Sequence, residues 1–202
     1  MFYWFTKGIV YPFAHLYLGL RRSGLEHLPR SGPAIIVCNH SSYMDPVVLG
    51  SASPRPVQFI VLQWMYDLLL LRWFYWGMGT IPVRTGGTDS LAIRRALAAL
   101  RGGRVVGIFP EGSRSPDGRM REARPGVALI AALSGAPVVP ALIDGASDSL
   151  PVGGRFPLPA NVRVRFGPAL RFTRDKGSRD RDQLRSFAVA LEGAIRDLAP
   201  VP

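Results

Sequence analysis

The sequence predicts an α/β fold: a mostly parallel central sheet flanked by helices, with a membrane-associating helical element at the N-terminus. Compact apolar runs of strand-like composition alternate along the chain with stretches of helical periodicity. The strand, helix, strand succession between residues 79 and 109 implies a parallel pair of strands joined by a crossover helix. An aromatic and aliphatic stretch over residues 1–20 precedes these elements.

Length and charge limit the classes of protein that fit. The 202 residues are enough for one domain with a large core, and the single cysteine rules out a disulfide within the chain. The formal charge is +11, and all but two of the 25 basic residues are arginine. Such a charge attracts polyanions, but no nucleic-acid-binding signature accompanies it, and we expect no nucleic acid partner. A positive mean hydropathy of +0.14 in so basic a chain favours an anionic membrane surface.

The N-terminal stretch is interpreted as a retained anchor. Lys7 and the lack of a basic segment before the first apolar residues argue against a secretory signal. Pro12 weakens a membrane-spanning helix, whereas the Phe, Tyr and Trp content favours an interfacial one. We therefore divide the chain into a membrane-associating segment, 1–24, and a second domain, 25–202. The alternative is a helix that packs on the core.

The remaining elements follow in order. Residues 59–79 form a second apolar block, read as a strand followed by a helix, in which Asp67 and Arg72 argue against a membrane span. Asp89 or Ser90 caps a helix that ends at a glycine pair, and Ser178 caps the last helix. Turns are expected after Arg84 and at residues 116–118. The other predicted strands and helices are a strand at 34–38, a short helix at 47–50, a strand at 104–109, a helix at 125–134, and strands at 137–143 and 161–166.

Two polar motifs follow apolar strands. The first, Asn39–Asp45, places a histidine and a carboxylate five residues apart, His40 and Asp45, which suits a general base and the acid that orients it. The second is Phe109–Ser115, with the sequence FPEGSRS. By itself the histidine and aspartate pair also fits a buried strand that ends in a polar turn.

Together the motifs resemble a known family. Asn39–Asp45, Gly79–Arg84, Phe109–Ser115 and the run APVVP at 136–140 are similar, in this order, to the glycerolipid acyltransferases, particularly the 1-acylglycerol-3-phosphate acyltransferases. The similarity continues at Arg124–Gly126 and covers most of the chain beyond the N-terminal segment.

The resemblance implies roles for individual residues. His40 would be the base that removes a proton from the acceptor hydroxyl, and Asp45 would fix its tautomer and stabilise the imidazolium. The substrate hydroxyl is then itself the nucleophile, and no covalent enzyme intermediate is needed. Cys38 lies at the end of an apolar strand, where we expect a core residue rather than a nucleophile.

The second motif would bind the acceptor. Arg114 would pair with its phosphate, and the backbone N–H groups of Gly112 and Ser113 would contribute donors. Glu111 would orient the glycerol or hold Arg114, and Arg84 would be available to an anion at the end of its strand. A surface turn stabilised by a Glu/Arg ion pair is the alternative.

The implied reaction is transfer of a fatty acyl group from acyl-CoA, or acyl-carrier protein, to the sn-2 hydroxyl of 1-acylglycerol-3-phosphate (lysophosphatidate), giving phosphatidate. Glycerol-3-phosphate, another lysophospholipid or a glycolipid are alternative acceptors. A non-catalytic basic membrane-binding module is the alternative outside enzymes. We expect no cofactor beyond the acyl donor, no metal, and a peripheral or monotopic protein on the cytoplasmic face of the membrane. Residues 59–79 would line the tunnel for the acyl chain.

Overall fold

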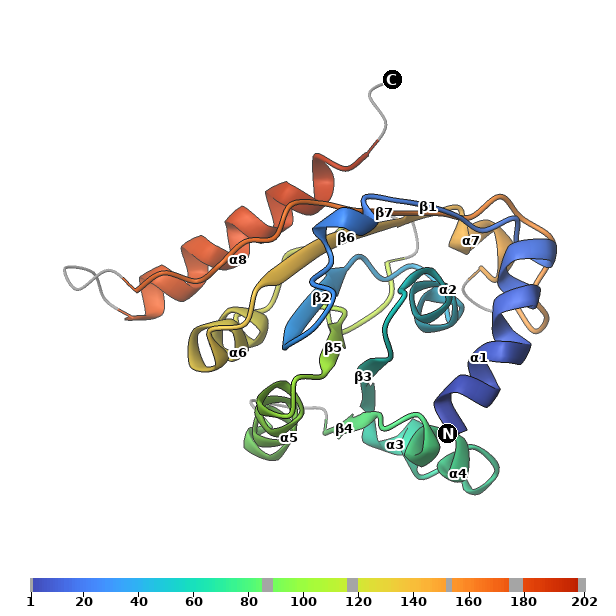
Figure 1. Ribbon diagram of the computed structural model, residues 1–202, viewed down its shortest axis with the longest axis horizontal. Helices are drawn as coiled ribbons and strands as arrows, with labels where there is room; N and C mark the ends of the chain where they lie inside the picture. Colours follow the sequence, from blue (N-terminus) through green and yellow to red (C-terminus); the bar gives the residue numbers. More distant parts are fainter. Residues whose placement is uncertain (1, 85–88, 116–119, 152–153, 175–179, 200–202) are drawn as a thin grey trace.

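A seven-stranded sheet forms the centre of the molecule in the computed structural model (Figure 1). The structure describes residues 2–84, 89–115, 120–151, 154–174 and 180–199. The strand order is β1-β7-β6-β2-β5-β3-β4, and every neighbouring pair is parallel except β6 and β7. The predicted α/β fold with a mostly parallel sheet is confirmed.

The bounds of the elements are as follows. The strands are β1 (Arg21–Ser23), β2 (Ala34–Cys38), β3 (Val57–Leu62), β4 (Ile81–Val83), β5 (Val105–Ile108), β6 (Val138–Asp144) and β7 (Arg163–Phe166). The α-helices are α1 (Phe2–Pro12), α2 (Asp45–Ala52), α3 (Gln63–Tyr66), α4 (Leu69–Gly77), α5 (Ser90–Arg101), α6 (Gly126–Ser134), α7 (Ala146–Ser149) and α8 (Asp180–Arg196). A π-helical turn, η1 (Phe13–Tyr17), and a 3-10 turn, η2 (Leu25–His27), complete the set.

Helices cover both faces of the sheet, as the burial of the central strand β2 shows. All five residues of β2 are buried, as expected for a central parallel strand with helices on both sides. Ile36 and Cys38 point into the core beneath α2 and η1, whereas Ile35 and Val37 point into the core beneath α5, α6 and α8. The sheet is thus the middle layer of three (Figure 1).

The N-terminal residues are helical, but they also reach the sheet. Trp4, Phe5 and Ile9 of α1 are exposed. After η1 the chain enters β1, which pairs in parallel with β7; this strand was not predicted, because three exposed residues carry no apolar pattern. The proposed boundary after residue 24 stays a prediction, as does membrane association. Among the described residues, no helix is long and apolar enough to cross a membrane.

The apolar block at 59–79 is divided differently from the prediction. It contains β3, which begins earlier at Val57, and then two short helices, α3 and α4, instead of one. The Asp89 cap is confirmed, since its side chain accepts from the backbone N–H groups of Leu91 and Ala92. The turns predicted after Arg84 and at 116–118, and the Ser178 cap, lie outside the described residues.

Candidate active site

The two polar motifs meet because their strands are neighbours. β2 and β5 pair in parallel, so their carboxyl ends lie at the same edge of the sheet, where open α/β sheets bind ligands. The backbone N–H of Ser115 donates to the His40 carbonyl at 2.7 Å, and the His40 N–H donates to Glu111 Oε1 at 2.8 Å. These bonds fix the second motif against the first.

The predicted base and acid are in direct contact. His40 Nδ1 lies 2.8 Å from Asp45 Oδ2, with the histidine side chain 20% exposed and the aspartate fully buried. Because a carboxylate only accepts hydrogen bonds, Nδ1 carries the proton and donates it to Asp45. The lone pair of Nε2 is thereby left to accept a proton from another molecule.

Asp45 is held in place by the backbone. It is the first residue of α2, and its Oδ2 also accepts from the N–H groups of Ser41 and Ser42, at 2.7 and 2.8 Å. The Ser42 hydroxyl donates to the Leu150 carbonyl and accepts from the Met44 N–H. Both serines therefore build the turn between His40 and α2, which also sets the direction of the Asp45 carboxylate.

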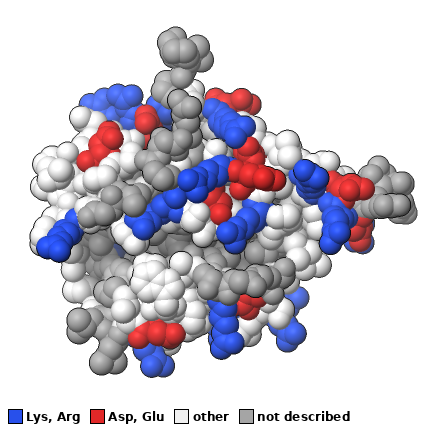
Figure 2. All heavy atoms as spheres, turned by 180° about the vertical axis from the view of Figure 1, so that it is seen from behind, with Lys and Arg blue, Asp and Glu red and all other residues white. Residues whose placement is uncertain are grey.

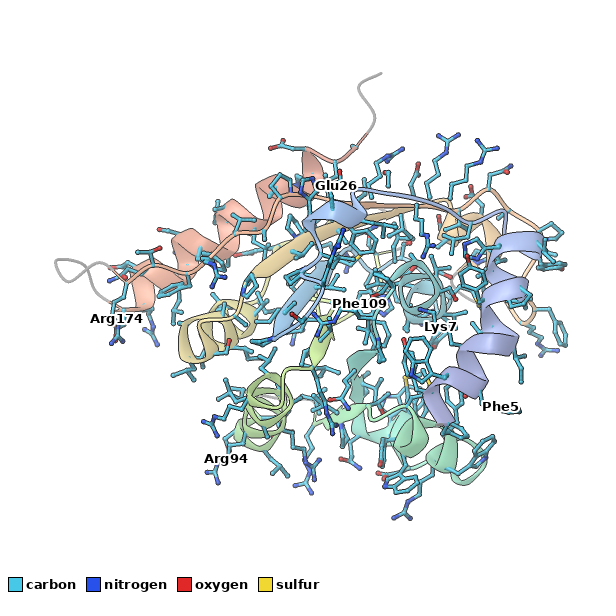
Figure 3. All side chains as sticks on the ribbon, in the orientation of Figure 1. Phe5, Lys7, Glu26, Arg94, Phe109 and Arg174 are labelled. Carbon is cyan, nitrogen blue, oxygen red and sulfur yellow. The ribbon has the colours of Figure 1, made fainter. Side chains whose placement is uncertain are left out.

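Aromatic stacking fixes the plane of the imidazole. The His40 and Phe109 rings stack at 4.4 Å between centroids with 22° between planes, and Phe109 stacks in turn on Phe59 at 5.9 Å. Phe109 directly follows β5 and lies in the middle of the molecule (Figure 3). With Asp45 holding one ring nitrogen and Phe109 one ring face, His40 has little rotational freedom.

His40 opens onto a largely apolar cavity of about 430 Å³. Helices α1 and α2, strand β3 and helices α3 and α4 form its walls. The predicted tunnel segment supplies nine wall residues: Phe59, Ile60, Val61, Leu62, Trp64, Met65, Phe74, Tyr75 and Met78. The contribution of α1, through Tyr3, Thr6, Lys7 and Val10, was not predicted. The same volume also reaches His40, Gly112, Ser113 and Arg114.

Arg114 lies at the polar end of this cavity. Its guanidinium carbon is 3.5 Å from the centre of the Tyr43 ring, and its Nη1 is buried without a hydrogen-bond partner among the described residues. Ser113 and Gly112 are exposed beside it. The Gly112 N–H already donates to the Phe109 carbonyl at 3.3 Å, so a substrate oxygen would have to share this N–H with that carbonyl. The roles of all three in binding stay predictions.

Gly112 is required by its backbone and its surroundings. Its φ is +71°, a conformation that favours glycine. A Cβ at this position would lie 2.6 Å from Cζ of Arg124, so the guanidinium of Arg124 packs directly on the loop. Arg124 belongs to the segment that resembled the family, but sequence reasoning assigned it no contact with the second motif.

Two predicted binding residues, Glu111 and Arg84, do not line the cavity. Glu111 is buried behind His40, does not line the cavity, and makes no ion pair with Arg114 among the described residues. Burial raises the pKa of Glu111, opposed by the hydrogen bond from the His40 N–H. Arg84 is exposed outside the cavity, and its N–H donates to Asp89. Contact of either residue with substrate stays a prediction; Glu111 here positions the His40 backbone.

Sequence reasoning also missed Asn39. This buried side chain donates to the Ile143 carbonyl and accepts from the Ile143 N–H, at 2.9 and 2.8 Å. It therefore joins the end of β2 to β6 as a further pair of sheet hydrogen bonds would. The signal for Asn39 was its place between an apolar strand and the histidine. At the end of a strand, backbone N–H and C=O groups lose their partners in the sheet, and a polar side chain can satisfy them.

Cys38 is a core residue, as expected. It is fully buried, and burial together with the nearby Asp45 charge raises the pKa of its thiol well above the ordinary value. A thiol that stays protonated is a poor nucleophile. In the described parts of the chain no three His, Cys, Asp or Glu side chains are grouped to hold a metal. The expectation of a reaction without metal or cofactor stays a prediction.

Known proteins resemble this chain in sequence and in fold. Residues 19–144 match the family model described as Acyltransferase. The chain belongs to the acyltransferase family. Its relatives include the chloroplastic 1-acyl-sn-glycerol-3-phosphate acyltransferase LPAT1 of Arabidopsis thaliana, 33% identical over 77% of this chain and 43% of the relative. A 1-acyl-sn-glycerol-3-phosphate acyltransferase of Pseudomonas aeruginosa is 27% identical over 88% of this chain and 69% of the relative.

A solved acyltransferase structure has the same fold. The crystal structure of the 1-acyl-sn-glycerophosphate acyltransferase PlsC from Thermotoga maritima matches with a TM-score of 0.76, covering 99% of this chain and 83% of that one at 24% identity. The chain spans only about two fifths of the first two curated relatives, 43% and 38% of their lengths. Family membership and fold are shown; the reaction of this chain is a proposal.

Proposed function

We propose that the protein transfers a fatty acyl group from acyl-CoA, or acyl-carrier protein, to the sn-2 hydroxyl of 1-acylglycerol-3-phosphate. The observation that carries this proposal is the His40–Asp45 pair at one end of an apolar cavity that Arg114 also lines. A base, a site for an alkyl chain and a cation for a phosphate are the three features that this reaction requires. The names of the relatives support the same acceptor.

Each bond change follows from the position of His40. The acceptor hydroxyl attacks the thioester carbonyl as His40 Nε2 takes its proton, and the ionised Asp45 stabilises the imidazolium that forms. Collapse of the tetrahedral intermediate forms the ester and breaks the C–S bond. The thiolate then takes the proton from His40, so the free thiol leaves and the neutral imidazole is restored.

The cavity suits the hydrocarbon part of a substrate. Its volume of about 430 Å³ is in the usual range for a ligand site, on the order of 300–1,000 Å³. Phe59, Val61 and Met65 are typical of an alkyl-chain wall, which gains from apolar burial without directional bonds. We assign it to the acyl chain, whose thioester would lie at His40.

Arg114 would bind the phosphate of the acceptor. Arg114 lines the cavity and forms no ion pair among the described residues, so its guanidinium is available to a phosphate, whose planar recognition favours arginine over lysine. Ser113, exposed at the same end of the cavity, would add a donor.

Membrane binding would bring lipid substrates to this cavity. Large apolar side chains are exposed on α1, η1, α3 and α4, close to the cavity walls: Trp4, Phe5, Ile9, Leu16, Tyr17, Trp64, Trp73 and Trp76. Such residues favour the interface of a bilayer, and the net charge of +11 favours an anionic one. Seen from behind relative to Figure 1, the molecule has basic and acidic side chains interleaved on its surface (Figure 2). We place the lipid surface on the α1 side, at the cytoplasmic face.

The decisive experiment measures thiol release from acyl-CoA by the purified protein with lysophosphatidate, and identifies the product by mass. Wild-type protein should form phosphatidate, and His40→Ala should lose the activity while keeping the wild-type circular dichroism spectrum. Glycerol-3-phosphate, other lysophospholipids and a glycolipid test the acceptor. Liposome binding without turnover on any acceptor, unaffected by His40→Ala, would favour a non-catalytic membrane module.

A further inference from the structure

Arg124 lies against the loop that carries the second motif. Its guanidinium packs on Gly112, because a Cβ added to Gly112 would lie 2.6 Å from Cζ of Arg124, 2.7 Å from Nε and 3.0 Å from Nη1. Its backbone N–H donates to the Pro110 carbonyl at 3.1 Å. Gly112 lines the cavity and Arg124 does not. The guanidinium therefore contacts the loop from outside the cavity.

The charge of Arg124 has no acidic partner. Arg124 is exposed, and no ion pair among the described residues includes it, although Glu122 is exposed nearby. Arg121 differs, since its charge opposes the rise in the pKa of Glu111 and so already faces a carboxylate. No Asp or Glu is found among the described residues that line the cavity. A positive charge without compensation thus lies beside the loop.

The place of Arg124 in the chain makes this charge unfavourable for stability. Arg124 directly precedes Pro125, the N-cap of α6. The first turn of a helix carries partial positive charge, so a cation is disfavoured there unless an anion compensates it. A residue that breaks such a local rule without a partner in the fold points to a role in binding or activity.

The charge is close enough to act on an anion at the loop. An oxyanion bound by Gly112, Ser113 and Arg114 would lie within about 8 Å of the Arg124 guanidinium, which is no more than the Debye length of about 8–10 Å at physiological ionic strength. A phosphate monoester carries about 1.5 to 2 negative charges at pH 7, whereas a phosphodiester carries about one. The attraction is therefore stronger for the monoester.

We propose that Arg124 makes this loop select a phosphate monoester over a phosphodiester in the acyl acceptor, by its charge and without touching the phosphate. This inference rests on the proposed function of the loop. Arg114 would contact the phosphate from within the cavity, and Arg124 would add its attraction from behind Gly112. Free acceptor would gain affinity at the expense of a less favourable start of α6.

The test compares two acceptors whose head groups differ in charge. Wild-type protein, Arg124→Met and Arg124→Lys are assayed at saturating acyl-CoA for the KM of lysophosphatidate and of lysophosphatidylglycerol, which is a phosphodiester. If the diester is not turned over, its inhibition constant takes the place of its KM. Arg124→Met should raise the KM of lysophosphatidate about fivefold or more and that of the diester only about twofold, with kcat unchanged. Arg124→Lys keeps the charge and should stay close to wild type for both.

Salt and a matched substitution provide the controls. At about 1 M salt the Debye length is about 3 Å, and the KM values of Arg124→Met and wild type should converge. Arg94→Met removes an exposed arginine of α5 at the edge of the molecule (Figure 3) and should change neither constant. The proposal would be overturned by a wild-type KM for lysophosphatidate in Arg124→Met, by an equal rise for both acceptors, or by a lysine variant as weak as the methionine variant.

Two further measurements do not depend on turnover. If the protein acylates neither acceptor, the proposed function fails, but inorganic phosphate still tests the loop. At low ionic strength, phosphate should raise the melting temperature of wild type more than that of Arg124→Met, each measured against chloride at the same ionic strength. Without ligand, Arg124→Met should melt no lower than wild type, because it loses an unpaired cation before a helix. Equal stabilisation by phosphate, or a lower melting temperature of the free variant, would overturn the proposal.

Discussion

The guanidinium carbon of Arg114 lies 3.5 Å from the centre of the Tyr43 ring, and this contact joins the two motifs across the mouth of the cavity. Tyr43 stands in the turn between His40 and Asp45, whereas Arg114 comes from the loop after β5. The ring therefore fixes the cation next to the base. Stacking uses the face of the guanidinium and leaves its N–H groups for a substrate oxygen.

Tyr43→Ala should weaken binding of the phosphorylated acceptor. Loss of a partly exposed cation–π contact costs roughly 0.5–2 kcal/mol, so the KM for lysophosphatidate should rise about 2- to 30-fold. Tyr43→Phe keeps the ring and should keep the KM within about twofold. Steady-state kinetics at saturating acyl-CoA measures both values. A larger effect on kcat than on KM in Tyr43→Ala would contradict a role limited to positioning Arg114.

Asp45→Asn should slow the reaction without unfolding the protein. The amide keeps an oxygen for the N–H groups of Ser41 and Ser42, but it has no charge to stabilise the imidazolium of His40. General base catalysis contributes about 10²- to 10⁴-fold, and we expect kcat to fall within that range. The KM for the acyl donor should change little. A variant with more than a tenth of the wild-type kcat would show that Asp45 is not needed to orient the base.

Cys38 should be unreactive in the folded protein. Its pKa is raised by burial and by the Asp45 charge, so the thiol remains protonated at pH 8, and its side chain is closed to solvent. An aromatic disulfide reagent should label no thiol in the native state and one in guanidinium chloride. The protein should also keep its full activity after incubation with an alkylating reagent. Rapid loss of activity that Cys38→Ala prevents would contradict this assignment.

Glu111→Gln should change the pH dependence of stability. The pKa of Glu111 is raised above its ordinary value of 4.5, so the folded state binds this proton more tightly than the unfolded state. Stability from this group is greatest below that value and is lost as the pH rises through the raised pKa. Glutamine has no such loss and still accepts from the His40 N–H. The melting temperature of the variant relative to wild type should therefore increase from pH 5 to pH 8.

Glu122→Gln, at an exposed carboxylate, is the matched control and should show no such trend. A Glu111→Gln variant that falls below wild type by the same amount at both pH values would mean that the charge itself stabilises the site.

The sequence allowed six of the seven strands and the contact between His40 and Asp45 to be predicted, because both depend on local patterns. The apolar run of β2 leads directly to His40, and the turn that follows brings Asp45, the first residue of α2, back to the histidine. The order of the strands could not be predicted in this way. Nothing in the run at 161–166 shows that β7 is antiparallel to β6, since that direction depends on the connection and on packing.

The surroundings of the site were harder to predict for the same reason. Phe109 was visible in the second motif, but its stacking on His40 depends on β2 and β5 being neighbours. Glu111 was expected to orient the glycerol or hold Arg114; its bond to the His40 N–H could not be predicted, and its contact with substrate stays a prediction. Tyr3 of α1 and Gly50 of α2 line the same cavity although they are almost 50 residues apart in sequence, and only the packing of α1 on α2 brings them together.

Strand β1 connects the N-terminal helical segment to the edge of the central sheet. The Arg21 N–H donates to the Val162 carbonyl and the Val162 N–H donates to the Leu18 carbonyl, while the Leu20 N–H donates back to Ala14. Backbone hydrogen bonds thus run from η1 into the edge of the sheet. If α1 lies on a lipid layer, as proposed, the sheet whose strand β2 leads to His40 would tilt with it as one body.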